Sequence, residues 1–316
     1  DNPAVFSSLG LRDVSGISFE DVVMDYTFDG SGHAKTQKPF QVTGSEDISF
    51  KNVTFDGDNA DFGTGAGFGL SIRNSEGVVV EGSHFSTFFK AVQVVNSDDV
   101  ILRGNEITDI RSDGINVVAS NDVLVEGNHI HDFRTSPESG DHADMIQIFS
   151  NGTDRPTTGL IIRDNILDVG EGGKTQSIWM RNEEVDQGRA GEEMFYRDIV
   201  IENNMIANSH TNGIVIGETD GLTIQGNTLL RVDDPVLDET NIALTTPRIS
   251  VNKKAQNVTI EKNVTSDLRL PDGEVPEGWQ VGDNLIVQDN NPDAPNYVHD
   301  LFVAAAPGMA HDIANL

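Results

Sequence analysis

The chain repeats one short pattern of apolar and polar positions along most of its length. Three apolar residues alternate with polar ones and a polar break follows, as in residues 45–52 (SEDISFKN) and 97–104 (SDDVILRG). The first apolar residues of the repeats are Ile17, Ile48, Val78, Val100, Val123, Leu160, Ile199, Leu222 and Val258. Their spacings of 31, 30, 22, 23, 37, 39, 23 and 36 indicate a basic period of 22–23 residues, lengthened in places by insertions.

This repeat predicts strands. Period-2 runs rich in Val and Ile, broken by Gly, Asn, Asp and Ser, are typical of short strands. One period is too short for a propeller blade, and the leucine-rich consensus is missing. Each period holds two or three such runs, so we predict that it forms one turn of a solenoid. The expected fold is all-β, a right-handed parallel β-helix of roughly nine to ten coils.

A column of asparagines accompanies the repeat. Asn105, Asn128, Asn165, Asn204, Asn227 and Asn263 each lie five residues after the first apolar residue of their repeat. In stacked coils their amides can hydrogen-bond along the axis of the solenoid. Asn also tolerates the left-handed backbone conformation of a tight corner. We therefore predict a structural ladder at one corner of the coils.

The composition narrows the class of protein. The 316 residues include 51 acidic and 21 basic residues, giving a formal net charge of −30, and there is no Cys. Such a charge repels nucleic acid, and the missing Cys excludes disulfide and thiol chemistry. No apolar run approaches the ~18 residues of a membrane span. We expect a secreted, extracellular protein that is monomeric, with no nucleic-acid or membrane partner and no organic cofactor.

The repeat extends over most of a single expected domain, residues 1–316. The coils are predicted over about residues 14–265. The period is lost after Asp267, where several prolines follow. Residues 279–287 are a candidate last partial coil, and the rest of an irregular segment of about 266–316 is expected to cover the open end of the stack.

A second strand precedes the repeated pattern in the central coils. Its alignment places Val92, Ile115, Ile146, Ile178 and Ile214 in one column that should face inward. Because side chains alternate along a strand, two further columns should face outward. They contain Gln93, Asn116, Gln147, Trp179 and Val215, and then Val95, Val118, Phe149, Arg181 and Gly217. An outward-facing Trp179 would be a platform on which a sugar ring stacks.

Polar and cationic residues gather where these second strands begin. One column contains Arg111, His142, Lys174 and His210, and another contains Lys90, Asp113, Asp144, Gln176 and Asn212. Coils stacked about 4.8 Å apart would line up the four residues of the first column over roughly 14 Å, about three sugar units. The longest insertions are residues 133–141, 149–157, 167–175 and 183–195, and we expect them to form the walls of a groove. The alternative is a stripe of solvated charges with Asp113 and Asp144 as turn residues.

Residues 141–147 (DHADMIQ) form the densest part of these columns. Their spacing is not that of a zinc site, because no second His follows His142 at i+4. With Arg111 and Lys174 one coil away on either side, we predict that His142 is catalytic or binds substrate. The alternative is a His that serves only as a structural hydrogen-bonding group.

Two acidic segments are candidates for calcium, the one metal ion that we consider. Asp56, Asp58 and Asp61 offer oxygen ligands, as do Asp233-Asp234 with Asp238-Glu239. Neither segment has the spacing of an EF-hand, and an ordinary acidic loop is the alternative for both.

Over residues 14 to about 265 the repeat and the Asn column resemble the right-handed parallel β-helix proteins of the pectate-lyase-like superfamily. Within that group the chain is most similar to bacterial polysaccharide lyases and mannuronan C5-epimerases, which act on uronic-acid polymers in a groove along one face. The resemblance to the alginate lyases implies a Lys base and an Arg acid, often with calcium, and Lys174 and Arg111 offer these groups. The epimerases use a Tyr and a His near an Asp-Pro-His-Glu segment, which residues 141–144 (DHAD) echo.

The expected activity is therefore β-elimination in an anionic, alginate-like polysaccharide. The reaction needs a neutralised carboxylate, a base for the C5 proton and an acid for the leaving C4 oxygen. The neutralising candidates are Arg181 and Arg73, the base candidates Lys174 and His142, and the acid candidates Arg111 and His210. Asp144 would orient His142 or bind a metal ion. The remaining expected substrate-binding residues are Asp113, Asn116, Gln147, Gln176 and Trp179.

Rival functions stay open at this point. A glycoside hydrolase would use Asp113 and Asp144 as paired carboxylates on adjacent coils. A uronate C5-epimerase would use the same groove. A non-catalytic carbohydrate-binding or adhesion module would equally use the cationic column and Trp179.

Overall fold

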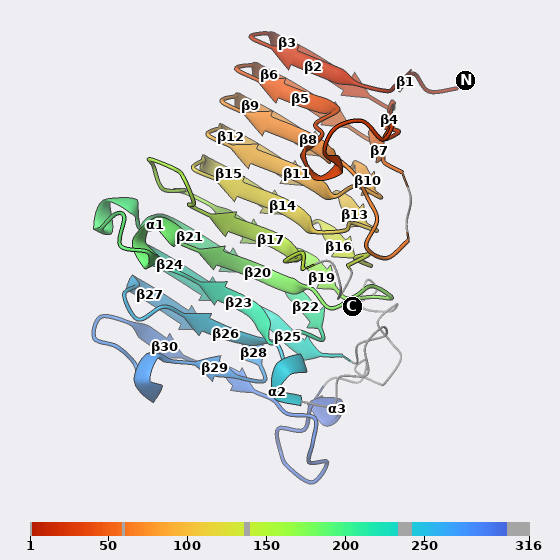
Figure 1. Ribbon diagram of the computed structural model, residues 1–316. Coiled ribbons are helices and arrows are strands. Elements are labelled where there is room, and N and C mark those ends of the chain that lie inside the picture. Colours follow the sequence, from red (N-terminus) through yellow and green to blue (C-terminus); the bar gives the residue numbers. More distant parts are fainter. Residues whose placement is uncertain (1, 59–60, 136–139, 233–241, 302–316) are drawn as a thin grey trace.

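A single chain winds into stacked coils and forms an elongated solenoid (Figure 1). The strands of successive coils pair into three parallel sheets that run along its axis. The computed structural model describes residues 2–58, 61–135, 140–232 and 242–301. Each coil visits the sheets in the same order, which we call A, B and C. The prediction of an all-β parallel β-helix is confirmed.

Sheet A has 11 strands: β1 (Val5–Phe6), β4 (Val23–Asp25), β7 (Thr54–Asp56), β10 (His84–Ser86), β13 (Glu106–Thr108), β16 (His129–His131), β19 (Ile166–Asp168), β22 (Met205–Asn208), β25 (Thr228–Arg231), β28 (Val264–Thr265) and β31 (Leu285–Ile286). Sheet B has 10: β2 (Leu9–Arg12), β5 (Phe40–Thr43), β8 (Phe68–Arg73), β11 (Lys90–Val95), β14 (Asp113–Val118), β17 (Asp144–Phe149), β20 (Gln176–Arg181), β23 (Asn212–Ile216), β26 (Arg248–Val251) and β29 (Leu268–Arg269).

Sheet C also has 10 strands: β3 (Ser15–Glu20), β6 (Glu46–Lys51), β9 (Glu76–Glu81), β12 (Asp98–Arg103), β15 (Asn121–Glu126), β18 (Ile161–Arg163), β21 (Tyr196–Glu202), β24 (Thr219–Gln225), β27 (Gln256–Glu261) and β30 (Gln280–Gly282). The described helices are short and lie between strands. They are α1 (Glu183–Asp186), α2 (Ile242–Thr245) and α3 (Val298–Leu301), with 3₁₀ turns η1 (Ala34–Thr36), η2 (Glu192–Met194) and η3 (Pro271–Gly273).

The strands begin and end further out than the periodicity indicated. Coiling starts at β1, ahead of residue 14, and continues through β30 and β31, which form the expected last partial coil. Residues 302–316, part of the segment expected to cover the open end, lie outside the described residues. Among the described residues no helix is both long and apolar enough to span a membrane.

The alternation of apolar positions produces one continuous core. The predicted inward column of sheet B is buried throughout, with Ile115, Ile146, Ile178 and Ile214 at 0% exposure. The first apolar residues of the repeats form a matching column in sheet C, where Ile48 pairs with Val78. Each strand buries its apolar side chains against the coils above and below. The core therefore runs along the whole axis, as expected of a solenoid.

The predicted asparagine ladder is present and buried. Each Nδ2 donates to the Oδ1 of the next asparagine from Asn105 through Asn263, and the ladder continues to Asn284, at 2.9–3.0 Å. The same Oδ1 atoms accept the backbone N–H of the preceding ladder residue, as in Asn128 N to Asn165 Oδ1 at 2.9 Å. The ladder therefore satisfies buried backbone donors at a corner where the sheet hydrogen bonding is interrupted.

One expectation about these corners is wrong. The left-handed residue is the one immediately before the ladder asparagine, for example Gly104 (φ 61°), Asp164 (φ 55°) and Asn203 (φ 55°). The ladder asparagines themselves are absent from the positive-φ positions. An amide that must point along the stack needs a fixed direction, and the preceding residue makes the turn that aims it.

A second ladder of hydroxyl groups lies at the corner between sheets B and C. The backbone N–H groups of Ser45, Ser75, Ser97 and Ser120 donate to the hydroxyl of the next coil, ending at Thr157, over 3.1–3.4 Å. These residues open the repeated pattern in the sequence. Both corners that flank sheet C are therefore held by buried polar side chains.

The longer insertions lie on the two sides of sheet B. Residues 133–141 and 167–175 connect sheet A to sheet B, whereas 149–157 and 183–195, which include α1 and η2, connect sheet B to sheet C. Residues 136–139 are outside the described part. Sheet B is thus the face bordered by loops on both sides, as predicted for the groove.

Replacing Asn165 by Ala is expected to lower the free energy of unfolding by about 2–4 kcal/mol, because two buried donors of Asn128 lose their acceptor. Denaturant titration followed by circular dichroism measures the change. Asn290→Ala, at an exposed position, is the control and should change stability by less than about 0.5 kcal/mol. Equal stabilities of the two variants would show that the ladder contributes nothing.

Candidate functional site

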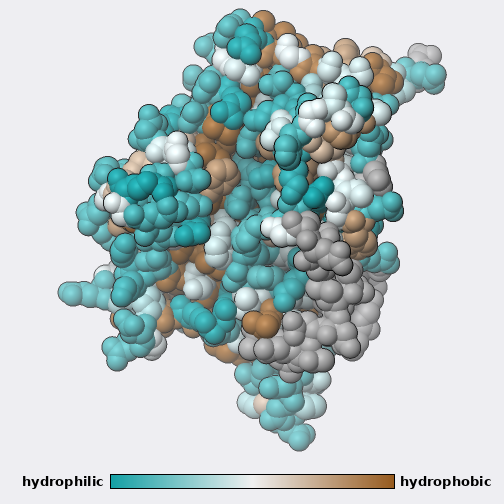
Figure 2. Space-filling model, viewed as in Figure 1, coloured by the Kyte–Doolittle hydropathy of each residue, from teal (hydrophilic) through white to brown (hydrophobic). Residues whose placement is uncertain are grey.

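Sheet B presents the polar columns on its outer face, toward the viewer of Figure 1. Figure 2 shows a band of hydrophilic side chains on this face, with a band of hydrophobic ones beside it, between raised margins. The pairing register is the one predicted: Lys90 lies opposite Asp113, and Asp144 lies opposite Gln176. The strand alignment predicted from the sequence therefore agrees with the observed pairing of adjacent rungs.

A chain of hydrogen bonds crosses three rungs and ends on His142. Asn212 Nδ2 donates to Gln176 Oε1, and Gln176 Nε2 lies 2.6 Å from His142 Nε2. On its other side, His142 Nδ1 lies 2.8 Å from Asp144 Oδ2. This order assigns the Nδ1 proton to the bond with Asp144 and leaves the Nε2 lone pair to accept from Gln176. His142 is thereby held in the tautomer that a general base needs.

Burial differs sharply between the two members of this pair. The Asp144 side chain is 0% exposed, whereas that of His142 is 56% exposed and lies with its ring 5.6 Å from that of Trp179. Asp144 Oδ1 has no hydrogen-bond partner among the described residues. Solvent therefore reaches His142 but not Asp144.

The two pKa values follow from this arrangement. The hydrogen bond that His142 donates to the Asp144 carboxylate raises the pKa of His142 above its ordinary value of 6.5. Burial raises the pKa of Asp144 from 3.8 to about 6, and the neighbouring Asp113 carboxylate adds to the rise. Burial and hydrogen bonding thus shift the pKa of both groups upward, as is common for residues that transfer protons.

Asp113 is the centre of a second buried cluster, one rung from Asp144. Its carboxylate pairs with Lys90, and Asn116 Nδ2 donates to its Oδ2 at 3.0 Å. Asn116 also donates to Gln147 Oε1 at 3.1 Å. The outward direction predicted for Asn116 is correct, yet the residue is 0% exposed because these neighbours cover it. Asp113 and Asn116 therefore form a layer beneath the surface and position Lys90 and Gln147.

In the predicted cationic column, Arg111 forms an ion pair with a carboxylate and Lys174 does not, among the described residues. Arg111 Nε and Nη2 donate to Asp141 Oδ2 at 3.0 and 2.9 Å, and Lys35 binds the other oxygen of Asp141. Lys174 is half-buried, with no ion pair to a carboxylate among the described residues. Asp141, treated only as part of a motif in the sequence, is therefore the anchor of the Arg111 end.

His210 occupies the far end of this column and is neutral. Burial lowers its pKa to about 4, with a further contribution from the positive charges of Lys174 and His142 nearby. Its Nδ1 accepts the backbone N–H of Asn212 at 3.0 Å, so its proton lies on Nε2. A neutral imidazole is a weak proton donor, which argues against His210 as the acid.

The remaining predicted residues lie around this centre. Trp179 faces outward, as expected, and is partly exposed beside His142. Arg181 forms an ion pair with Asp186 of α1 at 2.9 Å, which orients it along the margin of the sheet. Arg73 lies at the end of β8, toward the amino-terminal coils. It is three rungs from β17, since β8, β11, β14 and β17 pair in succession.

Asp56 and Asp58, two of the calcium candidates, lie at or next to β7 of sheet A rather than on sheet B. Among the described residues no three His, Asp or Glu side chains form a group suited to a metal ion. Asp58 Oδ2 instead accepts the backbone N–H of Phe28 at 2.6 Å, and Asp56 accepts the Ser86 hydroxyl at 3.3 Å. Asp61 lies in a loop beyond residues 59–60, which are not described, and Asp233-Asp234 with Asp238-Glu239 also lie outside the described residues. Asp56 and Asp58 are thus engaged by hydrogen bonds within the protein.

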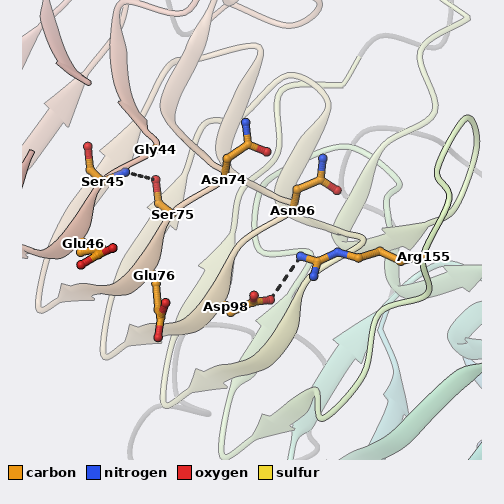
Figure 3. A pocket seen from close by; sticks show the side chains of 9 residues that line it. All are labelled: Gly44, Ser45, Glu46, Asn74, Ser75, Glu76, Asn96, Asp98 and Arg155. Atoms are coloured by element: carbon orange, nitrogen blue, oxygen red, sulfur yellow. Dashed lines mark hydrogen bonds and ion pairs between the residues drawn. The ribbon is translucent and has the colours of Figure 1, made fainter. Parts of the chain in front are cut away.

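A separate pocket of about 300 Å³ lies at the corner between sheets B and C (Figure 3). Glu46, Glu76 and Asp98 project from adjacent rungs, and Arg155 Nη2 donates to Asp98 Oδ1 at 3.2 Å. Arg155 belongs to the insertion that borders sheet B. The ion pair between Arg155 and Asp98 thus connects this insertion to sheet C.

The comparisons with known proteins agree with the fold. The family described as "Right handed beta helix region" matches residues 40–175. No curated protein matches the chain in sequence. Among solved structures, the chain is similar to an alginate lyase from Paenibacillus sp. str. FPU-7, at 17% identity over 83% of this chain and 91% of that chain, with a TM-score of 0.41.

The chain is also similar to two further solved structures. An exopolygalacturonase from Thermotoga maritima has 16% identity over 90% of this chain and 82% of that chain, with a TM-score of 0.48. PfbA, a surface adhesin of Streptococcus pneumoniae, has 15% identity over 93% of this chain and 80% of that chain, with a TM-score of 0.46. At these identities the likeness concerns the fold alone. The chain is a right-handed parallel β-helix protein.

Replacing Asp144 by Asn is expected to stabilise the protein above pH 6. The raised pKa means that the folded state binds the Asp144 proton more tightly than the unfolded state does. Ionisation therefore costs stability progressively from about pH 4 to pH 6, by up to about 3 kcal/mol. An Asn avoids this cost.

Thermal unfolding at pH 4 and pH 8 measures this effect, and the variant should gain stability over the wild type only at pH 8. Asp99→Asn, at an exposed position, makes the same charge change and should show no such gain. A destabilised Asp144→Asn at pH 8 would show that the carboxylate is a net stabilising group.

Proposed function

We propose that the protein is a polysaccharide lyase that cleaves an anionic, uronic-acid-containing polysaccharide by β-elimination on the outer face of sheet B. The observation that carries the proposal is the hydrogen-bond chain from Asn212 through Gln176 to His142 and Asp144, which ends on a half-exposed imidazole between two cations. The protein has a net charge of −30, yet Lys and Arg side chains gather on this face. This local positive charge favours an anionic ligand.

His142 is the base in this mechanism. Its Nε2 takes the C5 proton of the uronate once the substrate displaces the Gln176 amide. Asp144 stabilises the imidazolium that forms, as a buried carboxylate does for a catalytic His. The C4–O4 bond breaks, its electron pair leaves with O4, and a C4=C5 double bond forms. Trp179, beside His142, supports the sugar ring by stacking.

Lys174 and Arg111 flank His142 by one rung on either side. Lys174 donates a proton to the leaving O4, since its ammonium has no carboxylate partner among the described residues. Arg111, held in place by Asp141, stabilises the negative charge that the substrate carboxylate develops as the C5 proton leaves. The assignment differs from a Lys base with an Arg acid because the geometry orients His142, and not Lys174, through a carboxylate.

The rival activities are less well supported. A hydrolase with Asp113 and Asp144 as its paired carboxylates would need both groups to reach the glycosidic oxygen or its carbon. Both side chains are buried beneath Lys90, Asn116 and His142. An epimerase would need a second proton carrier such as Tyr, but Tyr196 is buried and its hydroxyl donates to the Arg181 carbonyl.

His142→Ala and Lys174→Ala are each expected to reduce turnover by about 10²-fold or more, because each removes one proton-transfer step. The assay is the ultraviolet absorbance of the unsaturated uronate, screened over alginate and other polyuronates, with product mass to distinguish elimination from hydrolysis. His84→Ala, a histidine on sheet A, is the control and should retain full turnover. Wild-type turnover in both site variants, or products that gain water, would refute the lyase assignment.

The pH dependence provides a separate test of the roles. A base must be neutral, so kcat/KM should rise with pH through the raised pKa of His142, with its midpoint above 6.5. Asp144→Asn removes the hydrogen bond that chiefly raises this pKa, so the midpoint should move to lower pH while kcat falls. An unchanged midpoint in Asp144→Asn would exclude His142 as the group that titrates.

A further inference from the structure

A second group of cations lies on the same face of sheet B, toward its amino-terminal coils. Lys38 precedes β5, and its Nζ donates to Gln93 Oε1 of β11 at 2.9 Å. The side chain thus crosses β8, where its Nζ lies 5.0 Å from the centre of the Phe68 ring. Lys90 Nζ lies 5.9 Å from the same ring, and Arg73 projects from the end of β8. Lys38 and Lys90 therefore both lie near the Phe68 ring.

Two of the three cations in this group have no carboxylate partner among the described residues. Lys90 pairs with Asp113, but neither Lys38 nor Arg73 has an ion pair with a carboxylate among the described residues. Burial lowers the pKa of Lys38 to about 8, with contributions from the charges of Arg73 and Lys90. Like charges brought together and desolvated destabilise one another. An anion that binds between these cations would relieve their mutual repulsion and so stabilise the protein.

An unsatisfied hydroxyl lies beneath the same group. Ser71 Oγ is buried and has no hydrogen-bond partner among the described residues. Ser71 pairs with Gln41 on one side and with Gln93 on the other, so it lies in the outward column of β8. Buried polar groups are normally hydrogen-bonded, and an unpaired one calls for an unseen partner. The hydroxyl is a second and independent indication that a polar ligand belongs here.

We propose that Lys38, Arg73 and Lys90 form an anion-binding subsite for a carboxylate of the polysaccharide, remote from the bond that is cleaved. This inference rests on the proposed function for its choice of ligand. β11 and β8 are two and three rungs from β17, so the subsite lies roughly 10–14 Å from His142, about two to three sugar units along the axis. The polysaccharide therefore runs parallel to the axis, and the enzyme requires a chain long enough to span both sites.

The test compares oligouronates of two and six residues prepared from the best substrate of the polyuronate screen, with carboxyl-reduced hexasaccharide as the neutral probe. Lys38→Gln and Arg73→Gln should each raise KM for the hexauronate about 10-fold and leave kcat within about twofold, because they remove ground-state binding. The diuronate, which cannot reach the subsite, should be cleaved equally well by all variants. Lys51→Gln, on an exposed lysine of sheet C, is the matched control.

Calorimetry of hexauronate binding to His142→Ala reads the subsite without turnover. A bound carboxylate raises the pKa of Lys38, so binding at pH 8 should take up about half a proton, as measured in buffers of different ionisation enthalpy. Lys38→Gln in the same background should abolish the uptake. The reduced hexasaccharide should show none.

The outcomes separate the two proposals. Hexauronate cleavage with KM unchanged in both variants would overturn the subsite and leave the lyase assignment intact. Hexauronate binding that depends on Lys38 and Arg73, without any cleavage, would support the subsite and overturn the lyase assignment. Equal losses for di- and hexauronate would show a structural role for these residues, and failure of the wild type to bind hexauronate would overturn the subsite.

Discussion

The hydrogen bonding between stacked parallel strands is the constraint on which the rest of this molecule depends. It holds successive coils about one strand spacing apart and in one register, so residues separated by 30 or more positions become neighbours, as Asn116 and Gln147 do. The buried Asn and Ser ladders reinforce that register at the corners, where strands end and backbone donors would otherwise lose their partners. The positions of site residues on different rungs therefore depend on the register that these corners fix.

The candidate site uses this rigidity to keep charges where solvation alone would not allow them. Asp144 is buried with one oxygen unpaired, and Lys38 is partly desolvated beside two other cations. Each arrangement lowers stability locally, and each changes a pKa toward the range in which protons move near neutral pH. The same face therefore combines an oriented imidazole with an unneutralised anion site along one axis.

The sequence predicted the architecture well because the repeat expresses it directly. The alternation identified the inward column, and the alignment placed Asp144 beside Gln176 and Lys90 beside Asp113. It misplaced the left-handed corner residue by one position. It also missed Lys38, which precedes its strand and reaches the face only by crossing a neighbouring coil. Periodicity carries no information about residues in the connections, because their direction is set by packing.

The sequence by itself determined the fold, the sheet register and the set of polar residues that share one face, since each follows from local periodicity repeated many times. The tertiary structure alone decided which of those residues are available for chemistry. It buried Asp113 and Asp144, paired Arg111 with Asp141, neutralised His210 and left His142 open to solvent. These outcomes depend on burial and on side-chain partners from other coils, and both arise only when the coils stack.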